Sequence, residues 1–341
     1  MSECLMAQRG GKYTRGRTIT DDNVAPVHFL FEQIWSANTS NSSSCSIDTD
    51  DQGNLYVSRR SGGIIKLSET DGSQIWVNTN INYNDPDVGN YYNMKNRAVV
   101  DESGDIYVVC DATFPYRNTP AKCIRKLSGI DGREIWDKDE YASNVIADNT
   151  GDIYVSYCSE VKKLSGIDGR EIWDIDFPYD VYDMGVDNSG DIILLGDTVA
   201  KLSNVDKTII WNSGPIGAYD LAIGKNNIYA TTDEGIKILS DVDGHIISTI
   251  NEYRGQRFLL SDNADNLYIS SSGDAYACVD KISSINNKKY GAYFATSTNG
   301  ISGSCGFAIY NDYIYILTQD SYMKSTIVNK CYRKNVYTIV S

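Results

Sequence analysis

The stretch KLSGIDGREIWD stands at residues 126–137, and the same twelve letters stand again at residues 163–174. The two copies start 37 residues apart. An active site needs its nucleophile or its metal ligands only once, so a repeated stretch of this length points to architecture before chemistry. Internal repeats with periods of about 20 to 50 residues are typical of solenoids, propellers and arrays.

The same pattern can be followed through most of the chain as two alternating half-motifs. The second half-motif is the quoted stretch itself, and its six copies end at residues 76, 136, 173, 211, 248 and 291. A seventh copy is missing from the C-terminal part of the chain. The first half-motif, D-x-x-G-(D/N)-(I/L)-Y-V, is clear at 50–57, 101–108 and 148–155 and weaker at 187–194, 226–230, 262–269 and 311–316.

One repeat unit is expected to form four short strands, which we letter a to d in chain order. In the second unit, residues 97–100, 105–110 and 123–127 predict strands a, b and c, because β-branched and aromatic residues are frequent in these runs. Asp131 and Gly132 suit the hairpin turn that leads into strand d, since glycine accepts a positive φ. Four strands in a unit of about 40 residues are typical of a β-propeller blade.

The ends of the chain indicate the number of blades. The C-terminal stretch 311–341 is expected to supply strands a to c of a further blade, but it contains no Ile-Trp strand. Residues 31–35 near the N-terminus, FEQIW, match the Gln-Ile-Trp of 74–76. We therefore predict an all-β, seven-bladed propeller of four-stranded blades, closed by the N-terminal strand, which completes the last blade. The expected domains are a basic arm at 1–26 and the propeller at 27–341.

All tryptophans of the chain occupy the same position of strand d, one in each of five units. An aromatic side chain that recurs once per blade is better explained by packing than by chemistry, because a ring of this size can fill the gap between neighbouring blades. The five residues are Trp35, Trp76, Trp136, Trp173 and Trp211.

The composition restricts the classes of function. With 41% hydrophobic residues, the chain can bury a large core. The net charge of −14 would repel phosphate backbones, so nucleic acid is not expected as a partner. There is no run of about 18 apolar residues, and the start MSECLMAQRGG lacks the apolar segment of a signal peptide. Neither membrane insertion nor export is expected.

Cysteine and histidine usage argues against a metal or disulfide framework. The eight cysteines form no CxxC pair, and a chain of this length can fold without disulfides, so we expect reduced, mostly buried thiols. His28 and His245 are the only histidines, which leaves too few for a multi-histidine zinc site and few bases for a catalytic triad. His245 is expected to be a turn residue. No metal or cofactor is predicted.

The stretch DTDDQGN at 48–54 admits two interpretations. Three close carboxylates could converge on a calcium ion, as in a D-x-D-x-x-G loop. The equivalent turns DESGD and DNTGD keep only part of that pattern. We therefore favour the alternative, in which the aspartate accepts hydrogen bonds from its own turn.

The quoted stretch resembles the repeat of the pyrroloquinoline-quinone-type propellers, whose usual form is A-L-D-A-x-T-G-K-x-L-W. The resemblance covers most of residues 31–341 and implies a propeller fold. It is carried in the two identical copies by Leu127, Gly132, Arg133, Ile135 and Trp136, and by Leu164, Gly169, Arg170, Ile172 and Trp173.

That family includes quinone-dependent alcohol and glucose dehydrogenases and also non-enzymatic scaffold propellers. The dehydrogenases commonly have eight blades, and many place an adjacent Cys-Cys pair beside the quinone, with a calcium ion nearby. The present sequence has no adjacent cysteines. We therefore expect a non-enzymatic propeller without a cofactor. A quinone-dehydrogenase-like or carbohydrate-active enzyme is the alternative, since a fold does not determine a function.

Two connections of the second blade are longer than a blade requires. Residues 80–95 join strand d of the first blade to strand a of the second, and residues 111–122 join strands b and c of the second. Both emerge on one face, and tyrosine-rich loops supply rigid contact area. We predict that this face binds a protein partner or a glycan, with a tolerated insertion as the alternative. The candidate binding residues are Tyr83, Asp85, Asp87, Tyr91, Tyr92, Phe114, Tyr116, Arg117 and Tyr179, and further candidates are Phe177, Pro178, Tyr182, Tyr253, Arg254 and Arg257.

The N-terminal segment differs in charge from the rest of the chain. Arg9, Lys12, Arg15 and Arg17 stand against one glutamate, so residues 1–20 carry +3 and the remainder of the chain carries −17. Such a segment is either a disordered leader or a basic arm that becomes ordered on an acidic partner.

The order Cys-Leu-Met-x-x-Arg-Gly-Gly at residues 4–11 resembles the leaders of some tailed-phage structural proteins. Together these features predict a non-enzymatic binding or display module. The expected setting is a phage virion, as a structural or decoration protein that the N-terminal arm anchors to a capsid or tail. A cytoplasmic protein is the alternative.

Overall fold

The computed structural model describes most of the chain, and the regular structure of the described residues consists of β-strands. The description covers residues 7–9, 12–14, 28–39, 44–59, 63–81, 98–112, 121–253, 259–262, 265–273, 276–283, 289–296, 301–311, 313–320 and 326–336. In these ranges, no helix is long and apolar enough to cross a membrane.

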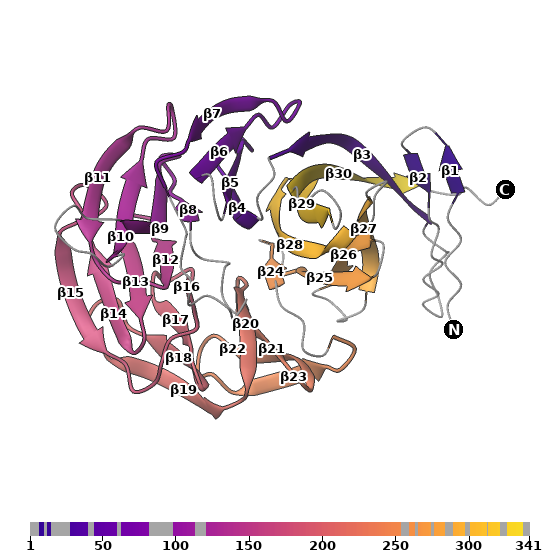
Figure 1. The fold of residues 1–341 in the computed structure, drawn as a ribbon. Coiled ribbons are helices and arrows are strands. Elements are labelled where there is room, and N and C mark those ends of the chain that lie inside the picture. The colour runs from indigo at the N-terminus through magenta and orange to yellow at the C-terminus, as the bar shows by residue number, and fades with distance from the viewer. Residues whose placement is uncertain are drawn as a thin grey trace.

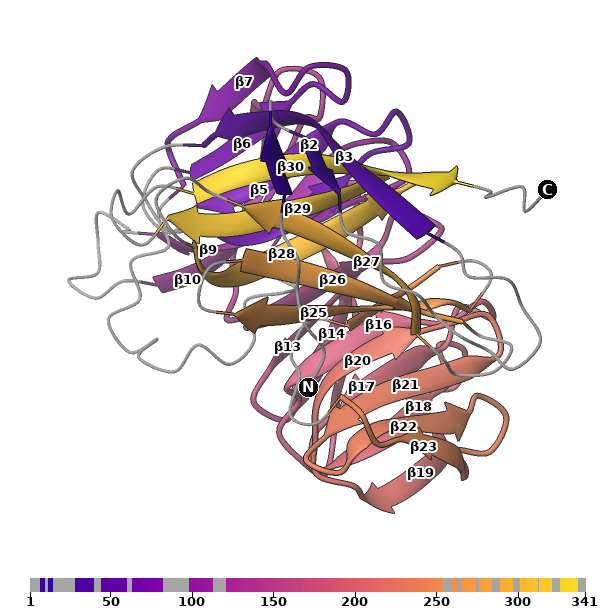
Figure 2. The same ribbon diagram turned by 90° about the vertical axis from the view of Figure 1, so that its right-hand side faces the viewer.

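Seven antiparallel sheets, the blades, follow one another in chain order around a ring (Figure 1). Strand a of each blade lies toward the centre and strand d toward the outside. Blades 4 and 5 lie across the ring from blades 1 and 7 (Figure 2). This arrangement confirms the predicted all-β, seven-bladed propeller.

The first six blades each contain four strands in the order a, b, c, d. Blade 1 comprises β4 (Ser44–Thr49), β5 (Leu55–Arg59), β6 (Gly63–Leu67) and β7 (Gln74–Asn78), and blade 2 comprises β8 (Ala98–Val100), β9 (Ile106–Ala112), β10 (Ala121–Leu127) and β11 (Glu134–Asp139). Blade 3 comprises β12 (Asn144–Ala147), β13 (Ile153–Tyr157), β14 (Glu160–Leu164) and β15 (Glu171–Asp176), and blade 4 comprises β16 (Asp183–Val186), β17 (Ile192–Leu195), β18 (Thr198–Leu202) and β19 (Ile209–Pro215). Blade 5 comprises β20 (Ala218–Ile223), β21 (Asn227–Thr232), β22 (Gly235–Ser240) and β23 (Ile246–Ile250), and blade 6 comprises β24 (Leu259–Ser261), β25 (Leu267–Gly273), β26 (Tyr276–Ile282) and β27 (Lys289–Thr296).

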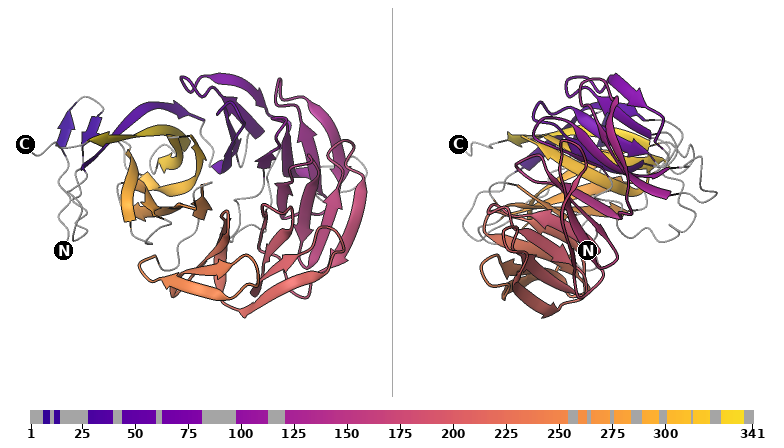
Figure 3. Two further views of the ribbon diagram at one scale, coloured as in Figure 1. Left: turned by 180° about the vertical axis from the view of Figure 1, so that it is seen from behind. Right: turned by 90° about the vertical axis from the view of Figure 1, so that its left-hand side faces the viewer.

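Blade 7 joins the two ends of the chain. Strands a to c are β28 (Ile301–Tyr310), β29 (Tyr313–Asp320) and β30 (Thr326–Val336), and strand d is β3 (His28–Asn38), which pairs antiparallel with β30. The view from behind shows the first and last segments of the ring side by side (Figure 3). The predicted closure by the N-terminal strand is confirmed. Strand a, however, precedes residue 311, because the half-motif at 311–316 marks the turn and strand b.

A short hairpin continues the sheet of blade 7 beyond β3. It consists of β1 (Ala7–Arg9) and β2 (Lys12–Thr14), with Arg9 opposite Lys12, and β2 pairs with β3. Two residues of the predicted basic arm therefore lie in strands at the outer edge of this blade. Arg15 and Arg17 lie outside the described residues, and the anchoring role of the arm stays a prediction.

Among the described residues, the buried apolar side chains form seven clusters, and each cluster lies between two neighbouring blades. Strand b of blade 1 shows how the apolar side chains are distributed between the two seams of a blade. Leu55 and Val57 pack with Tyr315 of blade 7, whereas Tyr56, which stands between them in the chain, packs with Ile106 of blade 2. Because successive side chains of a strand point to opposite faces, the Leu-Tyr-Val pattern fills both seams of one blade.

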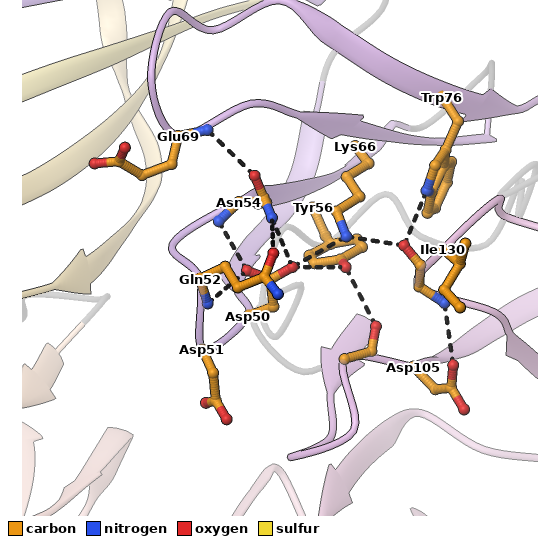
Figure 4. A network of polar contacts seen from close by, with 12 residues as sticks. Asp50, Asp51, Gln52, Asn54, Tyr56, Lys66, Glu69, Trp76, Asp105 and Ile130 are labelled. Atoms are coloured by element: carbon orange, nitrogen blue, oxygen red, sulfur yellow. Dashed lines mark hydrogen bonds and ion pairs between the residues drawn. The ribbon is translucent and has the colours of Figure 1, made fainter.

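A recurring pair of polar contacts, here called the Lys–Trp clamp, crosses the seams. The Nζ of Lys66 donates to the carbonyl oxygen of Gly129 in the next blade at 2.8 Å, and the Nε1 of Trp76 donates to the same oxygen at 3.1 Å (Figure 4). The predicted packing role of the tryptophans is thus confirmed and extended. Equivalent clamps run from Lys126 and Trp136 to Gly166, from Lys201 and Trp211 to Asp241, and from Lys330 and Trp35 to Glu69.

The aspartate of the D-x-x-G motif serves its own turn and the clamp lysine. In blade 1, Oδ1 of Asp50 accepts the backbone N–H groups of Gln52 and Asn54, and Oδ2 lies 3.0 Å from Nζ of Lys66 (Figure 4). Burial alone would raise the pKa of Asp50, but hydrogen bonds from Asn54 and Lys66 outweigh it, and the pKa lies below its ordinary value. The turn-capping interpretation is confirmed.

The c–d turn of blade 2 requires a glycine because the tryptophan of the preceding blade packs against it. Gly132 has a φ of +72°, and a Cβ placed on it would lie 2.6 Å from a ring carbon of Trp76. Gly72 and Gly244 lie against Trp35 and Trp211 in the same way. The quoted stretch therefore combines a clamp lysine, a carbonyl acceptor, a glycine that admits the neighbouring indole, and a tryptophan.

Among the described residues, the clamp is not formed at the seams between blades 3 and 4, 5 and 6, and 6 and 7, and the seam between blades 5 and 6 shows one reason. Ile238 and Ser248 stand opposite each other in the register that Lys126 and Trp136 occupy in blade 2, and neither side chain can form the clamp. The backbone N–H of Lys225 instead donates to a carboxylate of blade 6.

Carboxylates also link the innermost strands of adjacent blades. Oδ2 of Asp48 in blade 1 accepts the backbone N–H of Val100 in blade 2 at 2.9 Å. Burial, the largest effect, and the charge of Asp50 together raise the pKa of Asp48 to about 6, although backbone hydrogen bonds act in the opposite direction. Similar bonds run from Leu221 to Asp183 and from Leu259 to Asp220.

Replacement of the clamp glycine should destabilise the ring. Gly132→Ala is expected to lower the free energy of unfolding by roughly 2–4 kcal/mol. Alanine is strained at the positive φ of this position, and its methyl group would displace the indole of Trp76. The control is Gly190→Ala, where φ is +83° and no atom lies within 4 Å of the added Cβ. It should cost roughly 1 kcal/mol. Urea unfolding compares the two, and equal losses would contradict the indole contact.

Asp48→Asn should change how stability depends on pH. The folded pKa of about 6 exceeds the ordinary value of 3.8, so the folded state holds a proton that the unfolded state has lost. The stabilisation by this proton is complete below the unfolded pKa and is lost as the pH rises through about 6. From pH 4 to pH 7, the variant should therefore gain about 2.4 kcal/mol relative to the wild type. Parallel unfolding curves for the two proteins across this range would contradict the assignment.

Candidate functional site

The turns and connections of the blades define two faces of the ring. The b–c turns and d–a connections emerge on one, here called the loop face, and the a–b and c–d turns emerge on the other, the turn face. Of the nine residues predicted to bind a partner, Tyr179 lies in a described d–a connection. The other eight, Tyr83, Asp85, Asp87, Tyr91, Tyr92, Phe114, Tyr116 and Arg117, lie outside the described residues.

The d–a connection between blades 3 and 4, residues 177–182, is held to the b–c turn of blade 3. The backbone N–H of Phe177 donates to the carbonyl oxygen of Ser159 at 2.8 Å, and that of Val181 donates to the carbonyl of Cys158 at 2.8 Å. The side chains of the two donor residues, Phe177 and Val181, are buried. The connection is therefore attached to blade 3 at residues 177 and 181, and residues 178–180 between these two points are exposed.

The other side of the same connection rests on blade 4. The backbone N–H of Tyr182 donates to the carbonyl of Leu195 at 2.7 Å. A Cβ placed on Gly196 would lie 2.4 Å from the carbonyl oxygen of Asp180, so the glycine allows the two backbones to approach closely. The connection is thus fixed between two blades and presents Tyr179 on a rigid base.

Tyrosine side chains continue this surface to either side and form what we call the tyrosine arc, consisting of Tyr141, Tyr157, Tyr179, Tyr182 and Tyr219. Four of them are partly exposed, by 46% at Tyr141, 39% at Tyr179, 40% at Tyr182 and 37% at Tyr219. The arc extends from the entry of blade 3 to the start of blade 5. A row of exposed aromatic rings on a fixed backbone is typical of a recognition surface.

The rings of the arc are supported by neighbouring groups. The centroids of Tyr141 and Tyr157 lie 5.3 Å apart, and Tyr179 packs edge-on against Phe177 at 5.9 Å. The hydroxyl of Tyr219 donates to Oδ2 of Asp233 at 2.6 Å. These contacts hold the rings in place and lower the entropy lost when a partner covers them.

The charge near the centre of the arc is acidic. Partial burial and the carboxylates of Asp197 and Asp180 raise the pKa of the Tyr182 hydroxyl above its ordinary value. At the edge of the arc the acids are neutralised instead, because Nζ of Lys162 lies 2.9 Å from Glu140 and 3.1 Å from Glu160. The middle of the arc therefore offers an aromatic ring in the field of two carboxylates.

Five of the candidates lie in described connections of the loop face. Tyr179, Tyr182 and Pro178 are exposed, whereas Phe177 and Tyr253 are buried and contribute to packing. The binding role of the candidates stays a prediction. Arg254 and Arg257 lie outside the described residues. Tyr141 and Tyr219 could not be selected from the sequence, since neither belongs to a repeated motif or a long loop.

The remaining chemistry-bearing residues have structural positions. His245 lies in the c–d turn of blade 5, as predicted, where Nδ1 is 2.6 Å from Oδ1 of Asp243. Cys123 and Cys331 are buried thiols, and Cys158 is exposed in the b–c turn of blade 3. Within the described ranges, no group of three His, Cys, Asp or Glu side chains is arranged to hold a metal ion.

Comparisons with known proteins agree with the fold. No family model matches the sequence, and neither does any curated protein. Among solved structures, BamB from Moraxella catarrhalis is similar, with a TM-score of 0.56 and 11% identity over 96% of this chain and 100% of that one. The WD40 domain of Pan2 from Neurospora crassa is similar with a TM-score of 0.66 and 10% identity, over 88% and 95% of the two chains. At such identities the likeness shows a β-propeller fold alone.

The cysteines should report which parts of the ring are accessible. Cys158 should react with a maleimide within minutes, whereas Cys331 should stay unmodified until the protein unfolds, because burial hides the thiol and raises its pKa to about 12. Peptide mapping by mass spectrometry after timed labelling measures both rates. Labelling of Cys331 at the rate of Cys158 would contradict the arrangement of blade 7.

Proposed function

We propose that this protein is a non-enzymatic binding module that holds a protein partner on its loop face. The observation that carries the proposal is the tyrosine arc, in which partly exposed rings stand on a connection attached to two blades. Rigid aromatic side chains supply most of the binding energy in many protein interfaces. Because the backbone at 177–182 is already fixed, little ordering would be required on binding.

The charges support a basic segment as the partner. Tyr182 lies near the carboxylates of Asp180 and Asp197, and the whole chain carries −14. An arginine side chain can stack on a tyrosine ring and pair with carboxylates at the same time. The net charge would also speed the approach of a cationic partner.

The predicted loops of blade 2 belong to the same face. Residues 80–95 and 111–122 carry the tyrosines and the arginine that the sequence singled out, and blade 2 adjoins blade 3, where the arc begins. A partner seated on the arc could therefore extend over these loops. A glycan is the alternative ligand of this surface, and a binding comparison distinguishes it from a basic protein segment.

The setting that we propose is a phage virion, with the protein as an accessory or decoration component. Its support comes from the sequence alone, namely the leader-like order at residues 4–11 and the charge of +3 on residues 1–20. A basic N-terminal arm would join an acidic surface of the assembly, while the loop face remains available to its partner.

Binding of model peptides tests the proposed surface. Isothermal titration calorimetry of the full chain should detect an arginine-rich peptide and no binding of a glutamate-rich peptide of equal length. The double variants Tyr179→Ala/Tyr182→Ala and Asp180→Asn/Asp197→Asn should each weaken binding by about tenfold or more, since each change removes at least about 1.4 kcal/mol. The matched control is Asp131→Asn/Asp168→Asn, which removes the same charge from the turn face.

Three results would contradict the proposal. Equal loss of binding in the control would indicate attraction by net charge alone. Unchanged binding in both arc variants would place the peptide elsewhere. Binding of a panel of oligosaccharides, with no binding of the peptide, would identify the ligand as a glycan.

A further inference from the structure

A row of aliphatic side chains stands almost fully exposed on the turn face, opposite the proposed partner site. The c–d turns of blades 2 to 5 each place one β-branched residue at their tip. These residues are exposed by 88% at Ile130, 86% at Ile167, 88% at Val205 and 83% at Val242. We call them the tip row. Four large apolar residues in equivalent positions of adjacent blades form a repeated feature of the surface, unlike scattered exposed residues.

The turn itself does not require an aliphatic residue. In blade 1 the same position is occupied by Thr70, which is also exposed. The turn hydrogen bond is the same in both cases, since Gly72 N–H donates to Ser68 and Gly132 N–H donates to Ser128, each at 2.9 Å. Folding therefore does not explain why four successive tips carry isoleucine or valine.

The charges around the tip row are nearly balanced. Each aliphatic residue is followed by an aspartate, and a basic residue or histidine comes next or one position later. In the four segments 130–133, 167–170, 205–208 and 242–245, four aspartates stand against two arginines and one lysine, which gives −1 with histidine neutral. The chain as a whole carries −14. Two copies of this chain would repel each other over most of their surface, and the tip row is a place where that repulsion is small.

We propose that the tip row pairs with the tip row of a second copy, so that two propellers stack through their turn faces. A two-fold axis between blades 3 and 4 would place Ile167 opposite Val205 of the second copy and Ile130 opposite its Val242. Such an interface is self-complementary, because each contact occurs twice. It also sets the arginine that follows each isoleucine near an aspartate of the other copy.

The area is sufficient for a weak, specific dimer. An isoleucine or valine side chain removes roughly 100 Å² from water when it is fully buried. Eight such side chains from two copies contribute on the order of 800 Å², and the flanking charged residues bring the total to roughly 1,000 Å², near the lower limit of specific interfaces. Stacking on the turn face would leave both tyrosine arcs free on the outer faces. The dimer would then present two partner sites, and this does not depend on what the arc binds.

Sedimentation velocity of the full chain, at about 1 to 100 µM, tests the proposal. The wild type should change from monomer to dimer within this range. The variant with Ile130, Ile167, Val205 and Val242 all changed to Thr should show a dissociation constant at least thirtyfold higher. Threonine is chosen because Thr70 shows that the turn accepts it.

The control is Ile135→Thr/Ile172→Thr, which removes two isoleucines that are 48% and 47% exposed on the outer strands. It should dimerise like the wild type, and matching thermal unfolding curves should show that each variant is folded. The proposal is wrong if the wild type stays monomeric, if the tip variant still dimerises, or if the control loses the dimer equally. Co-flotation of a monomeric wild type with phosphatidylcholine vesicles would identify a lipid surface as the occupant instead.

Discussion

The structure depends on one contact that recurs at four of the seven seams, in which a lysine and a tryptophan of one blade donate to a single carbonyl oxygen of the next. Lys66 is nearly buried, and a buried ammonium group must be paired and hydrogen-bonded to be tolerated. One of its partners, Asp50, comes from its own blade, and the other, Gly129, comes from the neighbour. Blade 1 therefore cannot satisfy the polar group of this lysine without blade 2. The same requirement applies at the closure, where Lys330 and Trp35 come from opposite ends of the chain and meet at Glu69.

Much of this architecture could be predicted because it is periodic. The repeated half-motifs predict the strands of each blade, and the repeated Gly132 and Trp136 positions predict turns and packing. The acceptor of each clamp could not be predicted, since the pairing of Lys66 with Gly129 depends on how two blades are rotated relative to each other. The start of blade 7 was misplaced because residues 301–310 carry no half-motif.

The candidate site was predictable only in part, for a related reason. Connections that are longer than the repeat requires predict the loop face as the binding face, with Tyr179 among its candidate residues. The repeat pattern does not indicate which of the non-repeated side chains lie together on the loop face. Tyr141 and Tyr219 become neighbours of that surface through the arrangement of three blades, and Phe177, which looks similar in the sequence, turns inward. The tip residues illustrate the converse, because Ile130 belongs to the repeat and is nonetheless exposed.

The two faces of the ring thus have different characters, with an acidic aromatic surface on one and a nearly neutral aliphatic row on the other. The central claim is that the loop face holds a basic protein segment. Hydrogen–deuterium exchange of the full chain, with and without a saturating arginine-rich peptide, measures this most directly. Slower exchange on the loop face, centred on residues 139–141, 157–160, 177–182 and 218–220, is the predicted result. Protection of the c–d turns, or none at all under saturating conditions, would contradict the account.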